Sequence, residues 1–141
     1  MARLLPQSLE RTMETPAQVQ IALKLLWGSF ALGLVHVVSL ALFDESSWES
    51  AAFLITIVAV TSAAYAALIV YAGKRHNWAR VVLLLAAIAS VALFLFPADE
   101  PEPLWSTALI LVSSLLEIAA MFWLFSRVGN EWYREGPQSA F

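Results

Sequence analysis

The chain has 141 residues and a formal net charge of −3; 60% of its residues are hydrophobic and 13% are charged. Soluble domains have roughly 45–50% apolar and about 25% charged residues, so this chain lacks the polar surface that a water-soluble globule needs. This composition excludes an ordinary cytosolic enzyme. The negative net charge gives no sign of a nucleic-acid partner. The absence of cysteine excludes thiolate chemistry.

Four long apolar stretches follow one another along the chain. They cover about residues 19–43, 51–72, 78–96 and 104–126. Each approaches or exceeds the roughly 20 residues that an α-helix needs to cross a hydrocarbon core of about 30 Å. Because that core offers no partners for backbone groups, all four are expected to be helical. The short connections require antiparallel neighbours, so the predicted fold is one all-α integral membrane domain, an up-down-up-down four-helix bundle.

Capping and turn residues mark the ends of these stretches. The patterns at residues 15–18 and 46–49 are those of capping boxes. Gly73 is expected to cap the second helix, and Asn77 to be the N-cap of the third. Residues 1–18 are predicted to be a cytoplasmic segment, either a short interfacial helix or an unfolded tail.

The basic residues predict the orientation in the membrane. All eight Lys and Arg residues lie toward the N-terminus, near the connection between the second and third stretches, or toward the C-terminus. The connections at residues 44–50 and 97–103 carry acidic residues and no Lys or Arg. By the positive-inside rule, both termini are expected in the cytoplasm. Since the composition is typical of a bacterial gene, the bacterial inner membrane is the predicted location.

The middle connection carries the basic cluster Lys74, Arg75 and Arg80. Orientation in the membrane accounts for this cluster, and contact with anionic headgroups or with a partner is the more specific interpretation. Residues 74–83 (Lys-Arg-His-Asn-Trp-Ala-Arg-Val-Val-Leu) also carry a resemblance. They are similar to the basic Asn-Trp-Ala-Arg turn between spans 2 and 3 of small, uncharacterised bacterial inner-membrane proteins with four spans. The resemblance implies the four-span layout and transfers no site residues.

Glu117 is the acidic residue that lies inside a predicted span, close to the middle of residues 104–126. An ionisable group at that depth is costly to bury, which makes it a functional candidate. Ser113 shares its helix face, and Ser114 lies beside it. Two interpretations stand. A protonated Glu117 joins neighbouring helices by hydrogen bonds, or Glu117 couples the movement of an ion, proton or ligand.

His36 is the second ionisable candidate, on the outer side of the middle of the first stretch. A lone buried histidine is usually packed and hydrogen-bonded, whereas the functional interpretation pairs it with Glu117 across the bundle. The predicted intramembrane polar site is therefore Glu117, His36, Ser113 and Ser114, with Glu117 facing the interior. One His and one Glu are too few for a metal site, and the sequence predicts no cofactor.

Ala59, Ala63 and Ala67 recur every four residues on the second stretch, a spacing that lets helices approach closely. Packing within the bundle is one interpretation of this stripe. The other is contact with a second copy of the chain or with another membrane protein.

The chain has no Gly-x-Ser-x-Gly elbow and no His-Glu-x-x-His pattern, and the sequence does not predict an enzyme. The predicted function is that of a non-enzymatic multi-pass inner-membrane accessory or interaction protein, of subunit, regulatory or immunity type, in contact with the lipid bilayer. The alternative is a small transporter or lipid-carrier translocator that uses Glu117 with His36. A transporter needs a polar, water-reachable path around Glu117, whereas an interaction protein needs only a packed core.

Overall fold

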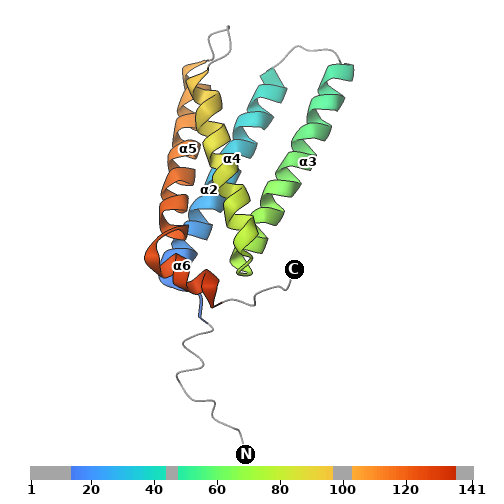
Figure 1. The fold of residues 1–141 in the computed structure, drawn as a ribbon. Coiled ribbons are helices and arrows are strands. Elements are labelled where there is room, and N and C mark those ends of the chain that lie inside the picture. The colour runs from blue at the N-terminus through green and yellow to red at the C-terminus, as the bar shows by residue number, and fades with distance from the viewer. Residues whose placement is uncertain (1–13, 44–47, 97–102, 136–141) are drawn as a thin grey trace, which may run out of the picture.

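The computed structural model describes residues 14–43, 48–96 and 103–135, and their regular secondary structure is entirely α-helical (Figure 1). The helices are α2 (Ala17–Phe43), α3 (Trp48–Gly73), α4 (Asn77–Leu95), α5 (Leu104–Leu124) and α6 (Arg127–Arg134). Helices α2, α3 and α5 are long and apolar enough to cross a membrane. The all-α prediction is confirmed, and these long helices begin within three residues of the predicted stretches.

The long helices lie side by side, and α2 and α5 form the most extensive pair. Helix α3 packs against α2 and α4, and α4 packs against α5. Helices α3 and α5 therefore lie diagonally opposite each other. Toward its N-terminal half α3 diverges from the other helices (Figure 1), and residues 52–57 are all exposed.

The α2–α5 contact follows the spacing of three and four residues that keeps one helix face against another. The buried positions on α2 are Val19, Ala22, Leu26 and Ser29, and those in the second half of α5 include Glu117, Ala120 and Leu124. Ala22, Ser29 and Ala120 are small, which allows a close approach of the backbones. The same close approach brings the polar members of the two faces within hydrogen-bonding distance.

The connection between α3 and α4 differs from the sequence expectation. Gly73 is the last residue of α3, and the left-handed residue is Arg75, with φ 69°. The Arg75 amide donates to Ala72 O and the His76 amide donates to Tyr71 O, which are the two bonds of a Schellman motif. A glycine usually takes the position that Arg75 occupies. His76 is the N-cap of α4 and makes no side-chain capping bond, so the predicted cap at Asn77 is one position too late.

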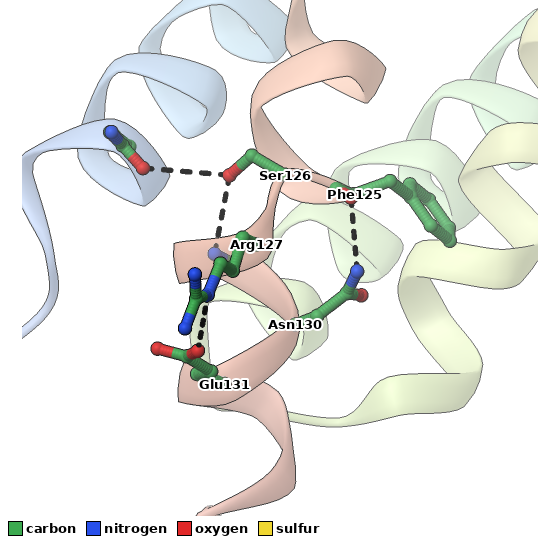
Figure 2. Close-up of polar contacts among 7 residues, drawn as sticks. Phe125, Ser126, Arg127, Asn130 and Glu131 are labelled. Atoms are coloured by element: carbon green, nitrogen blue, oxygen red, sulfur yellow. Dashed lines mark hydrogen bonds and ion pairs between the residues drawn. The ribbon is translucent and has the colours of Figure 1, made fainter.

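Helix α6 was not predicted. Its N-cap is Ser126, whose Oγ accepts a hydrogen bond from the Gly129 amide at 3.3 Å (Figure 2). Gly129 permits the sharp junction with α5, because a Cβ at this position would lie 2.4 Å from Leu124 O. The predicted cap at residues 46–49 and the segment 1–18 lie wholly or largely outside the described residues.

Candidate functional site

Glu117 points between the helices, where the sequence analysis expected it, and is 9% exposed. Its Oε1 accepts a hydrogen bond from Ser29 Oγ of α2 at 3.0 Å and another from the Tyr65 hydroxyl of α3 at 3.1 Å. Because a buried carboxyl group is stable only with polar partners, these two hydroxyls allow Glu117 to lie at this depth. One side chain of α5 thereby links to both α2 and the diagonally placed α3.

Ser113 extends this cluster by one turn of α5. Its Oγ lies 2.9 Å from Ser29 Oγ and donates to Ser29 O at 3.3 Å. A serine has one hydroxyl hydrogen. When Ser29 donates to Glu117, the single Ser113 hydrogen goes either to Ser29 Oγ or to Ser29 O. In both cases Ser113 donates to Ser29, and Tyr65 is the second donor to Glu117. Ser114 is half-buried and takes no part in this network of described side chains.

His36 does not join Glu117, which corrects the expectation of one shared site. Its Nε2 lies 2.7 Å from Ser106 Oγ, and its ring meets Trp105 edge-on with centroids 6.3 Å apart. Ser106 precedes Glu117 by about three helical turns, which corresponds to about 16 Å along α5. The cause is the antiparallel register, which aligns Ser29 with Ser113 and His36 with Ser106.

Tyr65 is the site residue that the sequence analysis missed. Its ring stacks on Phe30 of α2, with centroids 6.0 Å apart and an interplanar angle of 15°. A tyrosine in the middle of an apolar stretch was the available signal, because a buried hydroxyl needs a partner. The sequence alone could not show that this partner lies across the diagonal.

The basic cluster lies at the end of the helices where α6 packs. Arg75 Nε donates to Trp132 O at 3.1 Å, and Arg80 Nη1 donates to Asn130 Oδ1 at 2.8 Å. Lys74 is exposed, and its Nζ lies 5.8 Å from the centre of the Tyr71 ring. Two of the three predicted headgroup-contact residues therefore hold α6, and Lys74 points to the surface.

Cations and aromatic rings alternate across this end. The Arg75 guanidinium carbon lies 4.8 Å from the Trp132 ring centre, and the Trp132 and Tyr133 ring centres are 4.9 Å apart. The Arg80 guanidinium carbon lies 4.6 Å from the Tyr133 ring centre and 4.7 Å from that of Phe125. Such cation–π contacts stabilise a desolvated guanidinium, so both arginines can be partly buried.

Tyr133 fixes α6 to the end of α3. It is 5% exposed, and its hydroxyl donates to Ala72 O at 2.8 Å. Burial raises the pKa of Tyr133 to about 12, and the positive charge of Arg80 offsets part of that rise. The hydroxyl therefore stays protonated and remains a donor at neutral pH.

Around Ser126 the polar contacts hold the junction between α5 and α6 (Figure 2). Ser126 Oγ reaches Gln18 Oε1 of α2 at 3.5 Å, and Asn130 Nδ2 donates to Phe125 O at 3.0 Å. On the outer face of α6, Arg127 Nε and Glu131 Oε1 form an exposed ion pair at 3.0 Å. One face of α6 thus points to the long helices and the other to the surroundings.

Within residues 14–43, 48–96 and 103–135, no three His, Cys, Asp or Glu side chains are grouped so that they could hold a metal ion. An apolar groove of about 240 Å³ lies between α4 and α5, lined by Leu84, Ala87, Ile88, Val91, Ile118 and Met121. No family model, curated protein or solved structure matches the chain. The function is therefore argued from the hydrogen bonds and packing described above.

Proposed function

We propose that the chain is a four-span protein of the bacterial inner membrane, an up-down-up-down bundle with both termini in the cytoplasm. Helices α2, α3 and α5 are long enough to span, and the 19 residues of α4 measure about 28 Å, close to a hydrocarbon core. The contact of Arg75 with Trp132 supports the orientation, because it places the basic turn and the basic helix α6 at the same end.

Reporter fusions test this placement. A reporter that is active only outside the cytoplasm, fused after Phe141, is expected to stay inactive, and the same reporter inserted between residues 44 and 47 is expected to be active. Activity of the C-terminal fusion would contradict the orientation.

Within that membrane, we propose an accessory or interaction role rather than an enzymatic or transport role. The observation that carries this proposal is the use of Glu117, whose Oε1 is bound by hydroxyls from two other helices. A carboxyl group held in this way ties the bundle together. The groove between α4 and α5 is lined by apolar side chains and suits an acyl chain better than a polar substrate.

Helix α3 supplies the face on which such a role depends. In the most apolar 18-residue segment of α3, 6% of the residues are buried, against 17% in the corresponding segments of α2 and α5. Ala59, Ala63 and Ala67 are all exposed, so the small-residue face does not pack against the other described helices. We propose that a second copy of the chain packs on this face, because small residues permit close contact between membrane helices.

Substitutions at adjacent alanines test this contact. Ala63→Leu adds bulk on the proposed face, and Ala64→Leu adds the same bulk at an exposed neighbour about 100° around the helix. We expect Ala63→Leu to abolish energy transfer between differently labelled copies in liposomes, and Ala64→Leu to preserve it. Equal effects of the two substitutions would remove the proposed interface.

The second candidate function is transport, and the ionisable side chain between three helices is the observation that favours it. Glu117→Gln separates the two functions, because glutamine keeps an acceptor oxygen and loses the titratable group. If the chain is an interaction protein, we expect vesicles that contain wild type or Glu117→Gln to show the same proton flux as empty vesicles under an imposed pH gradient. Wild-type flux that Glu117→Gln abolishes without unfolding the protein would establish the transport role.

A further inference from the structure

Three buried N–H groups at the end where α6 packs have no hydrogen-bond partner among the described residues. They are Arg75 Nη2, Arg80 Nε and Trp132 Nε1. Buried donors without acceptors are rare in folded proteins, because each has lost its hydrogen bonds to water. The Arg80 guanidinium lies between the Phe125 and Tyr133 rings, whose faces act as weak acceptors. The Arg75 guanidinium lies over the Trp132 ring, so Arg75 and Trp132 are neighbours that each have a buried N–H without an oxygen or nitrogen acceptor among the described residues.

The Arg75 and Trp132 residues are in direct contact. Arg75 Nε bonds to Trp132 O at 3.1 Å, and the guanidinium carbon lies 4.8 Å from the Trp132 ring centre. Trp132 is 6% exposed, and its indole packs against the Tyr133 ring. Arg75 is half-buried and has a flexible side chain.

We propose that Arg75 and Trp132 form a binding site for a phosphate group. Arginine binds phosphate with two parallel N–H donors, and a phosphate has further oxygens that can accept from the indole N–H. Exposed Lys74 precedes Arg75 and adds positive charge at the entrance. The Arg75 guanidinium turns outward about its side-chain bonds when the phosphate enters.

The phosphate can come from a lipid headgroup or from free phosphate in solution. In the proposed membrane placement, the end that carries α6 lies at headgroup depth, so the lipid source rests on that placement. The binding chemistry itself rests only on the Arg75–Trp132 pair. Reporter fusions and proton-flux measurements test the placement and function independently, so a failure there is distinguishable from a failure of the phosphate site.

The test uses the full chain purified in dodecyl maltoside and measures its thermal unfolding midpoint. The probes are dioleoylphosphatidylglycerol, dioleoylphosphatidylcholine, and inorganic phosphate against chloride at equal ionic strength. We expect phosphatidylglycerol to raise the wild-type midpoint by several degrees, because a ligand that binds the folded state stabilises it. Trp132→Phe removes the N–H together with the five-membered ring, and the lost buried volume should lower its midpoint without a probe. Each probe-induced shift is therefore measured from the same variant's midpoint without a probe.

Trp132→Phe and Arg75→Gln are expected to lose at least half of the probe-induced shift. Arg127→Gln is the matched control, because Arg127 lies on the outer face of α6 with its side chain 91% exposed, and it should retain the full shift. A Trp132-dependent shift with inorganic phosphate identifies a free anion as a ligand, and one with lipid alone identifies a headgroup. The proposal is overturned if Trp132→Phe and Arg75→Gln respond to every probe as wild type does, or if wild type responds to none.

Discussion

Removing the Tyr65 hydroxyl tests whether the hydrogen bond across the helix diagonal stabilises the fold. Tyr65→Phe keeps the ring that stacks on Phe30 and removes the 3.1 Å bond to Glu117 Oε1. Hydrogen bonds between membrane helices contribute about 0.6 kcal/mol on average and up to about 1.7 kcal/mol. Glu117 keeps its bond from Ser29 after the substitution, so its acceptor is not left without a partner. We therefore expect a loss of about 1 kcal/mol.

A double-mutant cycle isolates this bond from other effects of the substitutions. The free energy of unfolding is measured in mixed micelles for wild type, Tyr65→Phe, Glu117→Leu and the double variant. The double variant should lose about 1 kcal/mol less than the two single losses added together. A matched cycle of His36→Ala with Glu117→Leu should be additive within about 0.5 kcal/mol, because His36 bonds to Ser106 instead.

Two results would refute this reasoning. An additive Tyr65–Glu117 cycle would mean that the hydroxyl and the carboxyl group do not interact in the folded protein. Coupling between His36 and Glu117 as strong as that between Tyr65 and Glu117 would mean that the register of α2 on α5 differs from the one described.

Three further predictions concern the end of the molecule that carries α6. Arg75→Gly should be more stable than Arg75→Ala by about 1 kcal/mol in chemical unfolding, because both lose the guanidinium contacts but only glycine relieves the backbone at φ 69°; equal stabilities would argue against the left-handed turn. Gly129→Ala should lower stability by about 1–3 kcal/mol and expose Trp132 to aqueous quenchers, because its Cβ would lie 2.4 Å from Leu124 O; an unchanged unfolding midpoint would contradict the junction. Folding raises the pKa of Tyr133 from 10.0 to about 12, so the stability that this shift contributes is fully present below pH 10 and is lost as the pH rises to 12. The expected loss in the free energy of unfolding is up to about 2–3 kcal/mol. Tyr133→Phe should remove this alkaline loss, and a pH profile identical to that of wild type would exclude the buried hydroxyl as its source.

The extent of the long helices could be predicted because membrane helices depend on apolar length and on end residues that are local in sequence. The prediction failed where distant contacts decide the outcome. Arg75 takes the left-handed position of the turn, and its side chain bonds to Trp132, a distant residue that nothing within the turn itself indicates. Helix α6 begins at Arg127, after its N-cap Ser126, and this junction depends on the fit of Gly129 against Leu124 O, a contact that a sequence pattern does not display.

The candidate site was only partly predictable for a related reason. The depth and inward direction of Glu117 follow from its place in an apolar stretch, and Ser113 follows from helical spacing. The partners from other helices depend on the relative shift of α2 and α5. An offset of about two helical turns decides whether Glu117 meets Ser29 or His36, and hydropathy contains no information about that offset.

The polar side chains on α2 and α5 supply that missing information within the folded chain. Ser29 pairs with Ser113 and Glu117, and two turns farther along α2 His36 pairs with Ser106. If α2 slid by two turns toward the C-terminal end of α5, His36 would take the place of Ser29 beside Glu117. Ser106 would then lose its imidazole partner. The polar pairs therefore favour the observed register, as single polar residues do in coiled coils. On this argument, the two hydrogen-bonded groups are separate in space and yet act together to specify how α2 docks on α5.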